Sequence, residues 1–196
     1  MKSLKFPPEF YQRNTRTVAR ELLGQRLVRI VNGKRISGII TETEAYMGVK
    51  DKAAHSYGGR QTPRVQAMYL EGGHAYIYFI YGMYYCLNVV TQKGGVPEAV
   101  LIRSVQIDES IDLALKNRKL KISQIRNLSN GPGKLCLALK IGPKLNGTSL
   151  QSSELFIEEN KLRAPKIQST PRIGIAYAEE WVDKPLRFVL SQTVSS

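Results

Sequence analysis

Residues that bind metals or form disulfides are scarce in this sequence. Its 196 residues include two cysteines and two histidines, with no HExxH or CxxC pattern, so the usual spacings of a zinc site are missing. Cys86 and Cys136 each lie in an apolar stretch, which favours small buried side chains and a reducing, cytosolic setting. We expect no metal and no cofactor, and leave carboxylates that bind magnesium open as an alternative.

A long apolar run is also missing. The opening segment, MKSLKFPPEFYQRNTR, is charged and contains a pair of prolines, unlike a signal peptide or a membrane-spanning helix. We therefore expect a cytoplasmic protein with no membrane partner, which in a bacterium would associate with the nucleoid.

Negative charge is in short supply. Sixteen Asp and Glu stand against 29 Lys and Arg, a formal net charge of +13, and the basic residues are spread from Lys2 to Arg187. Such a distribution favours a polyanionic partner, although charge that merely keeps a protein in solution is the alternative. The length suits one domain with a core that needs no disulfide. We predict a single domain over residues 1–196 that acts as a monomer.

The pattern of turn-forming and β-branched residues predicts an α+β protein. Asn32-Gly33 is a two-residue hairpin signal between segments rich in Ile, Val and Thr. Gly82 interrupts an apolar, tyrosine-rich stretch at residues 76–91, which is expected to form a hairpin with its turn near Tyr81, or else one continuous strand. The predicted fold is a single domain with a curved, mainly antiparallel β-sheet, flanking helices and a protruding β-hairpin.

The predicted elements have these bounds. Helices are expected at residues 14–23, 108–120 and 134–140. Strands are expected at residues 27–31, 35–47, 99–105, 155–157, 172–176 and 186–189. Residues 49–71 are expected to form a long functional loop with room for a short helix.

Tyrosines concentrate in the middle of the chain. Eight of the ten lie between residues 39 and 103: Tyr46, Tyr57, Tyr69, Tyr76, Tyr78, Tyr81, Tyr84 and Tyr85. Aromatic faces combined with positive charge favour stacked nucleobases and neutralised phosphates. Tyr81, at the expected hairpin tip, is placed to wedge into duplex DNA. The alternative is a buried sheet rich in tyrosine, because aromatic residues favour strands in general.

Strand alternation brings a carboxylate and an aromatic ring together. Successive side chains of a strand point to opposite faces, so Glu42, Glu44 and Tyr46 share one face. Glu44 and Tyr46 are then about 7 Å apart, a spacing at which a carboxylate can address a sugar carbon while the ring covers the base. The pattern alone favours a simpler interpretation, an exposed polar edge strand with two solvated glutamates.

Six stretches resemble, in order, the motifs of one enzyme family. They are ETEAYMG, AAHSYGGRQTPR, YIYFIYGMYYCLNVV, VLIRSV, GPGKLCLAL and PRIGIAYAEEWVDKPLRF. Together they resemble the alkyladenine (3-methyladenine) DNA glycosylase family, and the resemblance runs from the first predicted helix nearly to the end of the chain. Several long motifs in the same order are far more specific than any single short pattern.

The resemblance implies a monofunctional glycosylase without lyase activity, acting in base excision repair. Such an enzyme flips an alkylated or deaminated purine out of double-stranded DNA and hydrolyses its N-glycosidic bond; the implied lesions are 3-methyladenine, 7-methylguanine, hypoxanthine and ethenoadenine. One alternative is a non-catalytic protein that binds damaged DNA or RNA. A more remote one is a magnesium-dependent nuclease, whose acidic residues would be Glu42, Glu44 and Asp51.

Motif matches also imply roles for individual residues. Glu44 matches the general base that activates water, and Arg103 matches the arginine that helps to hold that water. Tyr81 matches the residue that intercalates into the DNA.

The remaining matches imply contacts with the flipped base. Tyr46 and Tyr78 match the aromatic residues that sandwich the base together with His55. Asn88 matches the residue that crowds the position of the exocyclic amine of guanine, and so disfavours the normal base.

Overall fold

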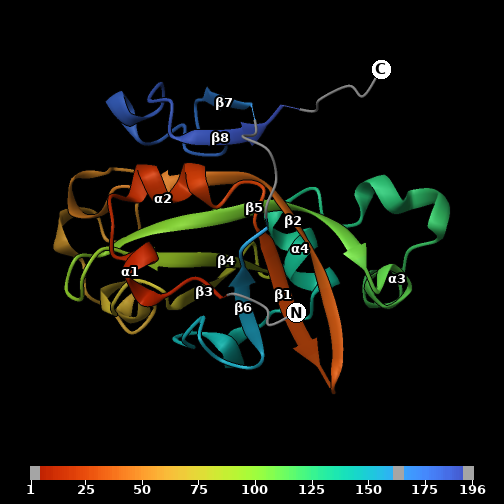
Figure 1. The fold of residues 1–196 in the computed structure, drawn as a ribbon. Coiled ribbons are helices and arrows are strands. Elements are labelled where there is room, and N and C mark those ends of the chain that lie inside the picture. Colours follow the sequence, from red (N-terminus) through yellow and green to blue (C-terminus); the bar gives the residue numbers. More distant parts are fainter. Residues whose placement is uncertain (1–4, 161–165, 192–196) are drawn as a thin grey trace.

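A curved antiparallel sheet forms the centre of the protein (Figure 1). The structure is a computed structural model and describes residues 5–160 and 166–191. The strands follow the order β3-β4-β5-β2-β1-β6, with β8 pairing with β2 and β7 with β8. Their bounds are β1 Arg26–Val31, β2 Lys34–Tyr46, β3 Ala75–Ile80, β4 Tyr84–Thr91, β5 Glu98–Glu109, β6 Leu155–Glu158, β7 Ile167–Thr170 and β8 Arg187–Leu190. This confirms the predicted single α+β domain with a mainly antiparallel sheet.

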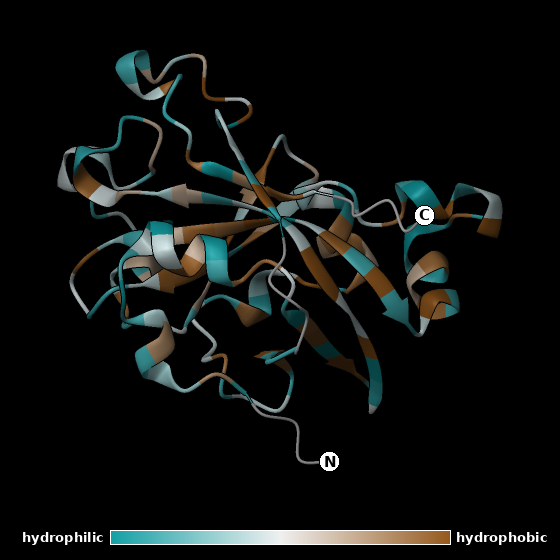
Figure 2. Cartoon of the chain, turned by 45° about the horizontal axis from the view of Figure 1, so that its top comes forward, coloured by the Kyte–Doolittle hydropathy of each residue, from teal (hydrophilic) through white to brown (hydrophobic). Residues whose placement is uncertain are grey.

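Short helices surround the sheet. The α-helices are α1 Pro8–Tyr11, α2 Thr15–Glu21, α3 Ile111–Arg118 and α4 Pro132–Ala138. The 3₁₀-helices are η1 Gly48–Lys50, η2 Tyr57–Gly59, η3 Gln66–Tyr69, η4 Ile122–Asn127, η5 Pro143–Leu145 and η6 Glu179–Trp181. Figure 2 shows hydrophobic residues along the central strands, with a mixture of hydrophilic and hydrophobic residues on the surrounding helices and loops. Among the described residues, no helix has the length and apolar character that crossing a bilayer requires.

The first helix that the sequence predicts, at residues 14–23, forms as α2, and the first predicted hairpin forms between β1 and β2. The Asn14 side chain accepts hydrogen bonds from the backbone N–H groups of Arg16 and Thr17, which caps α2. Asn32 and Gly33 adopt φ of 49° and 73° between β1 and β2, the left-handed pair that a tight hairpin needs.

Strand β2 lies inside the sheet, so the simpler interpretation of an exposed edge strand is wrong. Glu44 is opposite Leu101 of β5 on one side and Arg187 of β8 on the other. The hydroxyl of Thr43, on the opposite face, donates to the carbonyl of Ala19 in α2 at 2.8 Å. Thr43 and Glu44 are both fully buried. Residues far apart in the chain therefore enclose the centre of β2.

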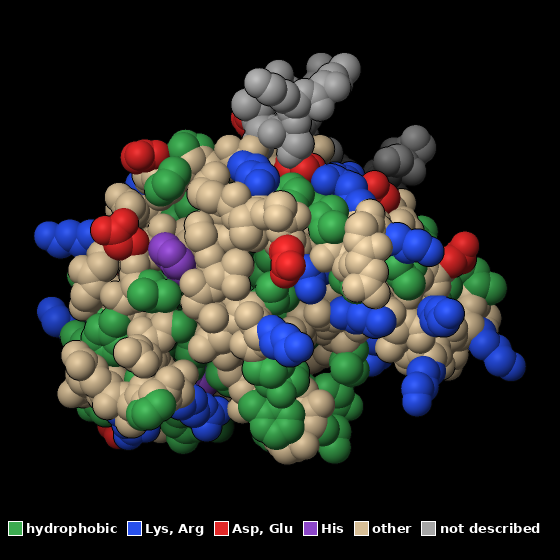
Figure 3. Space-filling view, turned by 90° about the horizontal axis from the view of Figure 1, so that it is seen from below, with side chains coloured by type: hydrophobic (Ala, Val, Ile, Leu, Met, Phe, Trp, Pro, Cys, Tyr) green, Lys and Arg blue, Asp and Glu red, His purple; other side chains and the backbone are tan. Residues whose placement is uncertain are grey.

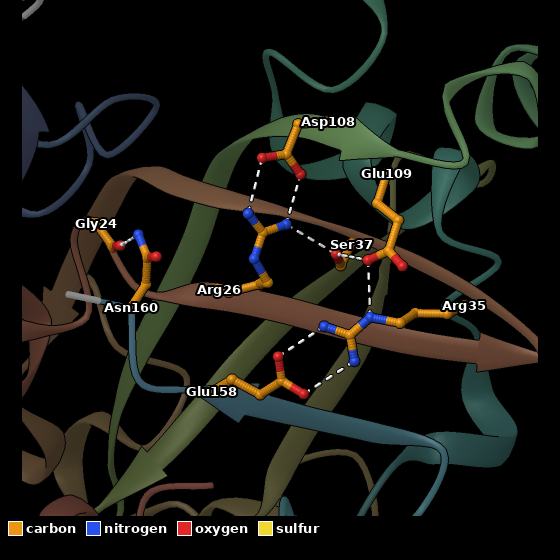
Figure 4. Close-up of polar contacts among 8 residues, drawn as sticks. All are labelled: Gly24, Arg26, Arg35, Ser37, Asp108, Glu109, Glu158 and Asn160. Atoms are coloured by element: carbon orange, nitrogen blue, oxygen red, sulfur yellow. Dashed lines mark hydrogen bonds and ion pairs between the residues drawn. The ribbon is translucent and has the colours of Figure 1, made fainter. Parts of the chain in front are cut away.

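The predicted helix at residues 108–120 begins too early. Asp108 and Glu109 belong to β5, and the helix starts at Ile111. Figure 4 shows the reason: Arg26 forms two hydrogen bonds with Asp108, and Arg35 joins Glu109 to Glu158. Arg26 of β1 and Arg35 of β2 thus hold Asp108 and Glu109 in β5. In the sequence alone, the two acidic residues fit the start of a helix equally well.

The predicted loop at residues 49–71 contains the end of η1 and two further 3₁₀-helices, η2 and η3, and it packs onto the sheet. Its second half joins a small apolar cluster with β3, β4 and β5, formed by Val65, Ala67, Met68, Tyr76, Val90 and Ala99. The cluster fixes the loop against the strands that carry the tyrosines.

The hairpin of β3 and β4 confirms the predicted turn. Tyr81 and Gly82 adopt φ of 53° and 67°, and the Tyr81 side chain is 79% exposed. Across the hairpin, Tyr78 is opposite Cys86 and Tyr76 is opposite Asn88. The alternative of one continuous strand is excluded.

Candidate active site

A cavity of about 270 Å³ lies between the β3–β4 hairpin, the first turn of α4 and residues 173–177. Six of the seven predicted site residues line it: Tyr46, His55, Tyr78, Tyr81, Asn88 and Arg103. The seventh, Glu44, is fully buried beside the cavity and is bonded to three of the lining residues, Tyr46, Arg103 and Ile173. The structure thus brings all seven residues together.

Three donors hold the buried carboxylate of Glu44. The Tyr46 hydroxyl donates to Oε2 at 2.9 Å, and the backbone N–H of Ile173 donates to Oε1 at 2.9 Å. Arg103 Nη1 lies 3.3 Å from the same Oε1. Burial raises the pKa of Glu44 above its usual value, although Arg103 and the two hydrogen bonds oppose the rise. A carboxylate with a raised pKa and fixed geometry is suited to accept a proton.

Arg103 bridges two glutamates. Its Nε donates to Glu42 Oε1 at 2.9 Å, and Glu42 is held in turn by Arg187 Nε at 2.5 Å. Burial alone would lower the pKa of Arg103, but Glu44 and Glu42 outweigh it and the pKa is raised. Arg103 therefore presents a permanent positive charge at the cavity wall.

A buried ion pair lies behind the cavity wall that Tyr46 and Ile173 form. Arg172 Nη1 and Nη2 contact the two carboxylate oxygens of Asp51 at 2.6 and 2.9 Å, and both side chains are fully buried. Arg172 Nη1 also donates to the carbonyl of Ala45 at 2.9 Å, and its guanidinium lies 4.7 Å from the centre of the Tyr46 ring. The pair fastens residues 171–178 to the end of β2, beside Glu44.

The predicted strand at residues 172–176 is therefore wrong. These residues bend around the cavity, with Gly174 at a φ of 77°. The backbone N–H of Ile173 bonds to Glu44 instead of to a neighbouring strand. The segment has the apolar, β-branched sequence that is typical of a strand, but its residues form a wall of the site.

His55 is a half-buried part of the aromatic wall. Its Nδ1 lies 2.8 Å from the Tyr76 hydroxyl, and its ring meets that of Tyr78 edge to face at 4.5 Å between centres. Burial, together with Arg64 and Arg60, lowers the pKa of His55 to about 4, so the imidazole is neutral at pH 7. A base lying parallel to the Tyr78 ring would therefore be steeply inclined to the His55 ring.

Asn88 forms a rigid part of the cavity floor. Its Nδ2 donates to the carbonyl of Tyr76, its partner across the hairpin, at 3.1 Å. The side chain is 4% exposed, so it has little freedom to move away from a bound group.

The nuclease alternative finds no support in the geometry. Its three candidate acids are engaged by arginines, Glu42 and Glu44 by Arg103 and Asp51 by Arg172. Within residues 5–160 and 166–191, no group of three or more His, Cys, Asp or Glu side chains is arranged to hold a metal ion. Two-metal catalysis needs several acidic side chains converging on one point.

Sequence reasoning missed the Asp51–Arg172 pair and the contribution of Tyr177. Tyr177 lines the cavity while remaining 67% exposed, so it forms part of the rim together with Tyr81. Both Arg172 and Tyr177 lie in the motif PRIGIAY, which supported the family resemblance without any assigned role. The pair joins this motif to Asp51, which lies in the loop predicted at residues 49–71. A contact between two such distant segments leaves no periodic pattern in the sequence of either.

Comparison with known proteins agrees with this site. The model of the family described as "Methylpurine-DNA glycosylase (MPG)" matches residues 9–194. Three bacterial relatives carry the name "Putative 3-methyladenine DNA glycosylase". The Clostridium acetobutylicum protein is 49% identical over 95% of this chain and 94% of its own length, that of Desulfitobacterium hafniense 50% over 95% and 96%, and that of Bacillus cereus 52% over 94% and 95%. The chain belongs to the methylpurine-DNA glycosylase family and is a DNA glycosylase.

Proposed function

We propose that this DNA glycosylase is monofunctional and acts, as a monomer, on damaged purines in double-stranded DNA. The damaged nucleotide is flipped into the cavity, where water cleaves its N-glycosidic bond. The observation that carries this proposal is the buried Glu44, held by Arg103 and Tyr46 at the wall of an aromatic cavity. Membership of a glycosylase family removes the alternative of a non-catalytic binding protein.

Glu44 acts as the general base. Its carboxylate takes a proton from water, the water oxygen bonds to the anomeric carbon, and the bond from that carbon to the base breaks with its electrons leaving on the base. The negative charge beside the sugar also stabilises its oxocarbenium-like transition state. Arg103 helps to hold the water and keeps Glu44 in place.

The aromatic wall binds the flipped base. Tyr46 and Tyr78 stack on its faces, with the His55 ring beside Tyr78 and steeply inclined to it; stacking is worth about 1–3 kcal/mol per base. Stacking favours electron-poor, cationic alkylpurines. Because His55 is neutral at pH 7, it adds no positive charge that would repel such a base.

The proposed lesions fall into two chemical groups. Cationic 3-methyladenine and 7-methylguanine leave readily without an acid, whereas neutral hypoxanthine and ethenoadenine need a proton on the departing base. All four purines are proposed substrates, and removal of any of them belongs to base excision repair.

The role of Glu44 predicts a separation of binding from catalysis. Glu44→Gln keeps the shape of the side chain but removes the base, so release of hypoxanthine from a duplex should fall by several orders of magnitude while affinity for that duplex persists. Glu42→Gln alters the other glutamate that contacts Arg103. Its rate of hypoxanthine release should fall much less. Single-turnover base release at saturating enzyme measures both, and undiminished release by Glu44→Gln would remove Glu44 from its role.

Tyr81 is proposed to fill the gap that the flipped nucleotide leaves in the duplex. Tyr81→Ala should weaken binding to lesion-containing duplex and slow base release, because an inserted side chain offsets unstacking that costs about a few kcal/mol per step. Tyr81→Phe keeps the ring and should retain most of the affinity. Fluorescence anisotropy with hypoxanthine-containing and undamaged duplexes gives the comparison; identical selectivity in Tyr81→Ala and the parent would reject the assignment.

Asn88 is proposed to exclude undamaged guanine by a clash with its exocyclic amine. Asn88→Ser shortens the side chain, so release of normal guanine should rise roughly tenfold, within the range that one blocking group in a pocket provides. Hypoxanthine, which lacks that amine, should be released at a rate close to that of the parent. Quantifying free guanine and hypoxanthine by chromatography tests this, and guanine release equal to the parent's would contradict it.

A further inference from the structure

The arginines of the sheet and of the cavity wall are paired with carboxylates of the protein. Their positive charge is therefore neutralised within the molecule. Arg26 pairs with Asp108, and Arg35 pairs with Glu109 and Glu158, as Figure 4 shows. The ion pairs of the cavity wall likewise occupy Arg103, Arg172 and Arg187. The net charge of +13 must therefore act on a partner through other side chains.

A dense group of such cations lies at the end of α3 and along η4. We call residues 116–126 the basic arm; it presents the exposed side chains Lys116, Lys119, Lys121 and Arg126. Within the described ranges, 5–160 and 166–191, none of these four forms an ion pair. The arm itself contains no Asp or Glu. Figure 3 shows Lys and Arg side chains projecting from the end of the molecule where Figure 1 places α3.

The basic arm is joined to a wall of the cavity. Asn117 in the arm donates a hydrogen bond from Nδ2 to the carbonyl of Ala138, the last residue of α4, at 2.8 Å. Pro132 and Gly133, in the first turn of α4, line the cavity. Seven helical residues span about 10 Å, so the hydrogen bond to the arm lies about one short helix away from the cavity wall.

We propose that the basic arm is a second DNA-contacting surface, which binds the sugar-phosphate backbone of the duplex outside the damaged nucleotide. The inference rests on the proposed action on double-stranded DNA. Duplex DNA carries one charge per about 1.7 Å of its axis, so a duplex at the cavity presents many phosphates beyond it. Contacts of this kind hold damaged and undamaged DNA equally and allow the enzyme to slide.

The composition of the arm favours a duplex backbone over other anionic partners. Residues 116–126 contain no aromatic side chain, so they lack the aromatic faces on which proteins that bind single-stranded RNA usually stack its bases. Only Ile122 and Ile125 are exposed apolar residues of η4, a six-residue 3₁₀-helix, which is little apolar surface to insert into a membrane. Flexible lysines are point charges suited to phosphates.

Salt dependence of binding tests the arm directly. The arm variant carries Lys116→Gln, Lys119→Gln, Lys121→Gln and Arg126→Gln. The matched control carries Arg16→Gln, Lys34→Gln, Lys93→Gln and Lys166→Gln, which alter four exposed cations elsewhere and change the net charge equally. Affinity for an undamaged duplex is measured by anisotropy from low to high salt. The slope of log K against log salt should become shallower by about 2–4 in the arm variant and by less than about 1 in the control.

Catalysis and folding are checked on the same proteins. At saturating enzyme, hypoxanthine release by the arm variant should stay within about twofold of the parent, because the arm holds DNA without touching the reacting atoms. A version with Lys116→Arg, Lys119→Arg and Lys121→Arg keeps the charge and should keep the parent slope, which guards against a folding effect.

Equal slopes for the parent and the arm variant would overturn the proposal. If, in addition, the arm variant bound single-stranded RNA or phosphatidylglycerol vesicles more weakly than the parent does, the arm would serve that partner instead of duplex DNA. Failure of the parent to release any base would reject the proposed function instead, and the binding slopes would still decide the role of the arm.

Discussion

The buried ion pair between Asp51 and Arg172 is the contact on which the geometry of the cavity depends. It fastens residues 171–178 to the end of β2, places the Arg172 guanidinium on the Tyr46 ring and brings the Ile173 N–H to Glu44. Removing one partner of a buried pair generally costs about 3–5 kcal/mol, because the other charge is left buried without compensation. A buried pair does not by itself show that a protein gains free energy of folding. Here it holds residues 171–178 and the end of β2 in a single arrangement around the Glu44 carboxylate.

The charge of Glu44 is set by two opposing effects. Burial disfavours the ionised form and raises the pKa, whereas Arg103 and the hydrogen bonds from Tyr46 and Ile173 favour it. Glu42 keeps Arg103 in position from the other side. The balance leaves a carboxylate with more affinity for a proton than one in water and with a fixed orientation, while the neutral His55 completes an aromatic wall without adding charge.

Local chemistry made much of this fold predictable. Asn32-Gly33 and Gly82 identified the two hairpins, and strand alternation placed Glu44 beside Tyr46, which a hydrogen bond between them confirms. The burial of Glu44 was not predictable, because it requires β8, more than 140 residues later in the chain, to pair with β2. Likewise the hydrogen bond of Ile173 goes to a side chain instead of a strand. The interruption at Gly82 placed Tyr81 at a hairpin tip, whereas the family resemblance, and not periodicity, identified Arg103, His55, Tyr78 and Asn88.

Hydrolysis of an N-glycosidic bond by water, with the DNA strand left intact, is the proposed reaction of this cavity. The most direct measurement follows a duplex with a single hypoxanthine, incubated with the parent protein in EDTA, and quantifies free base together with strand integrity before and after alkali. We expect free hypoxanthine and a strand that breaks only after alkali treatment. Strand breakage without alkali, or tight binding without any free base, would contradict the proposed reaction.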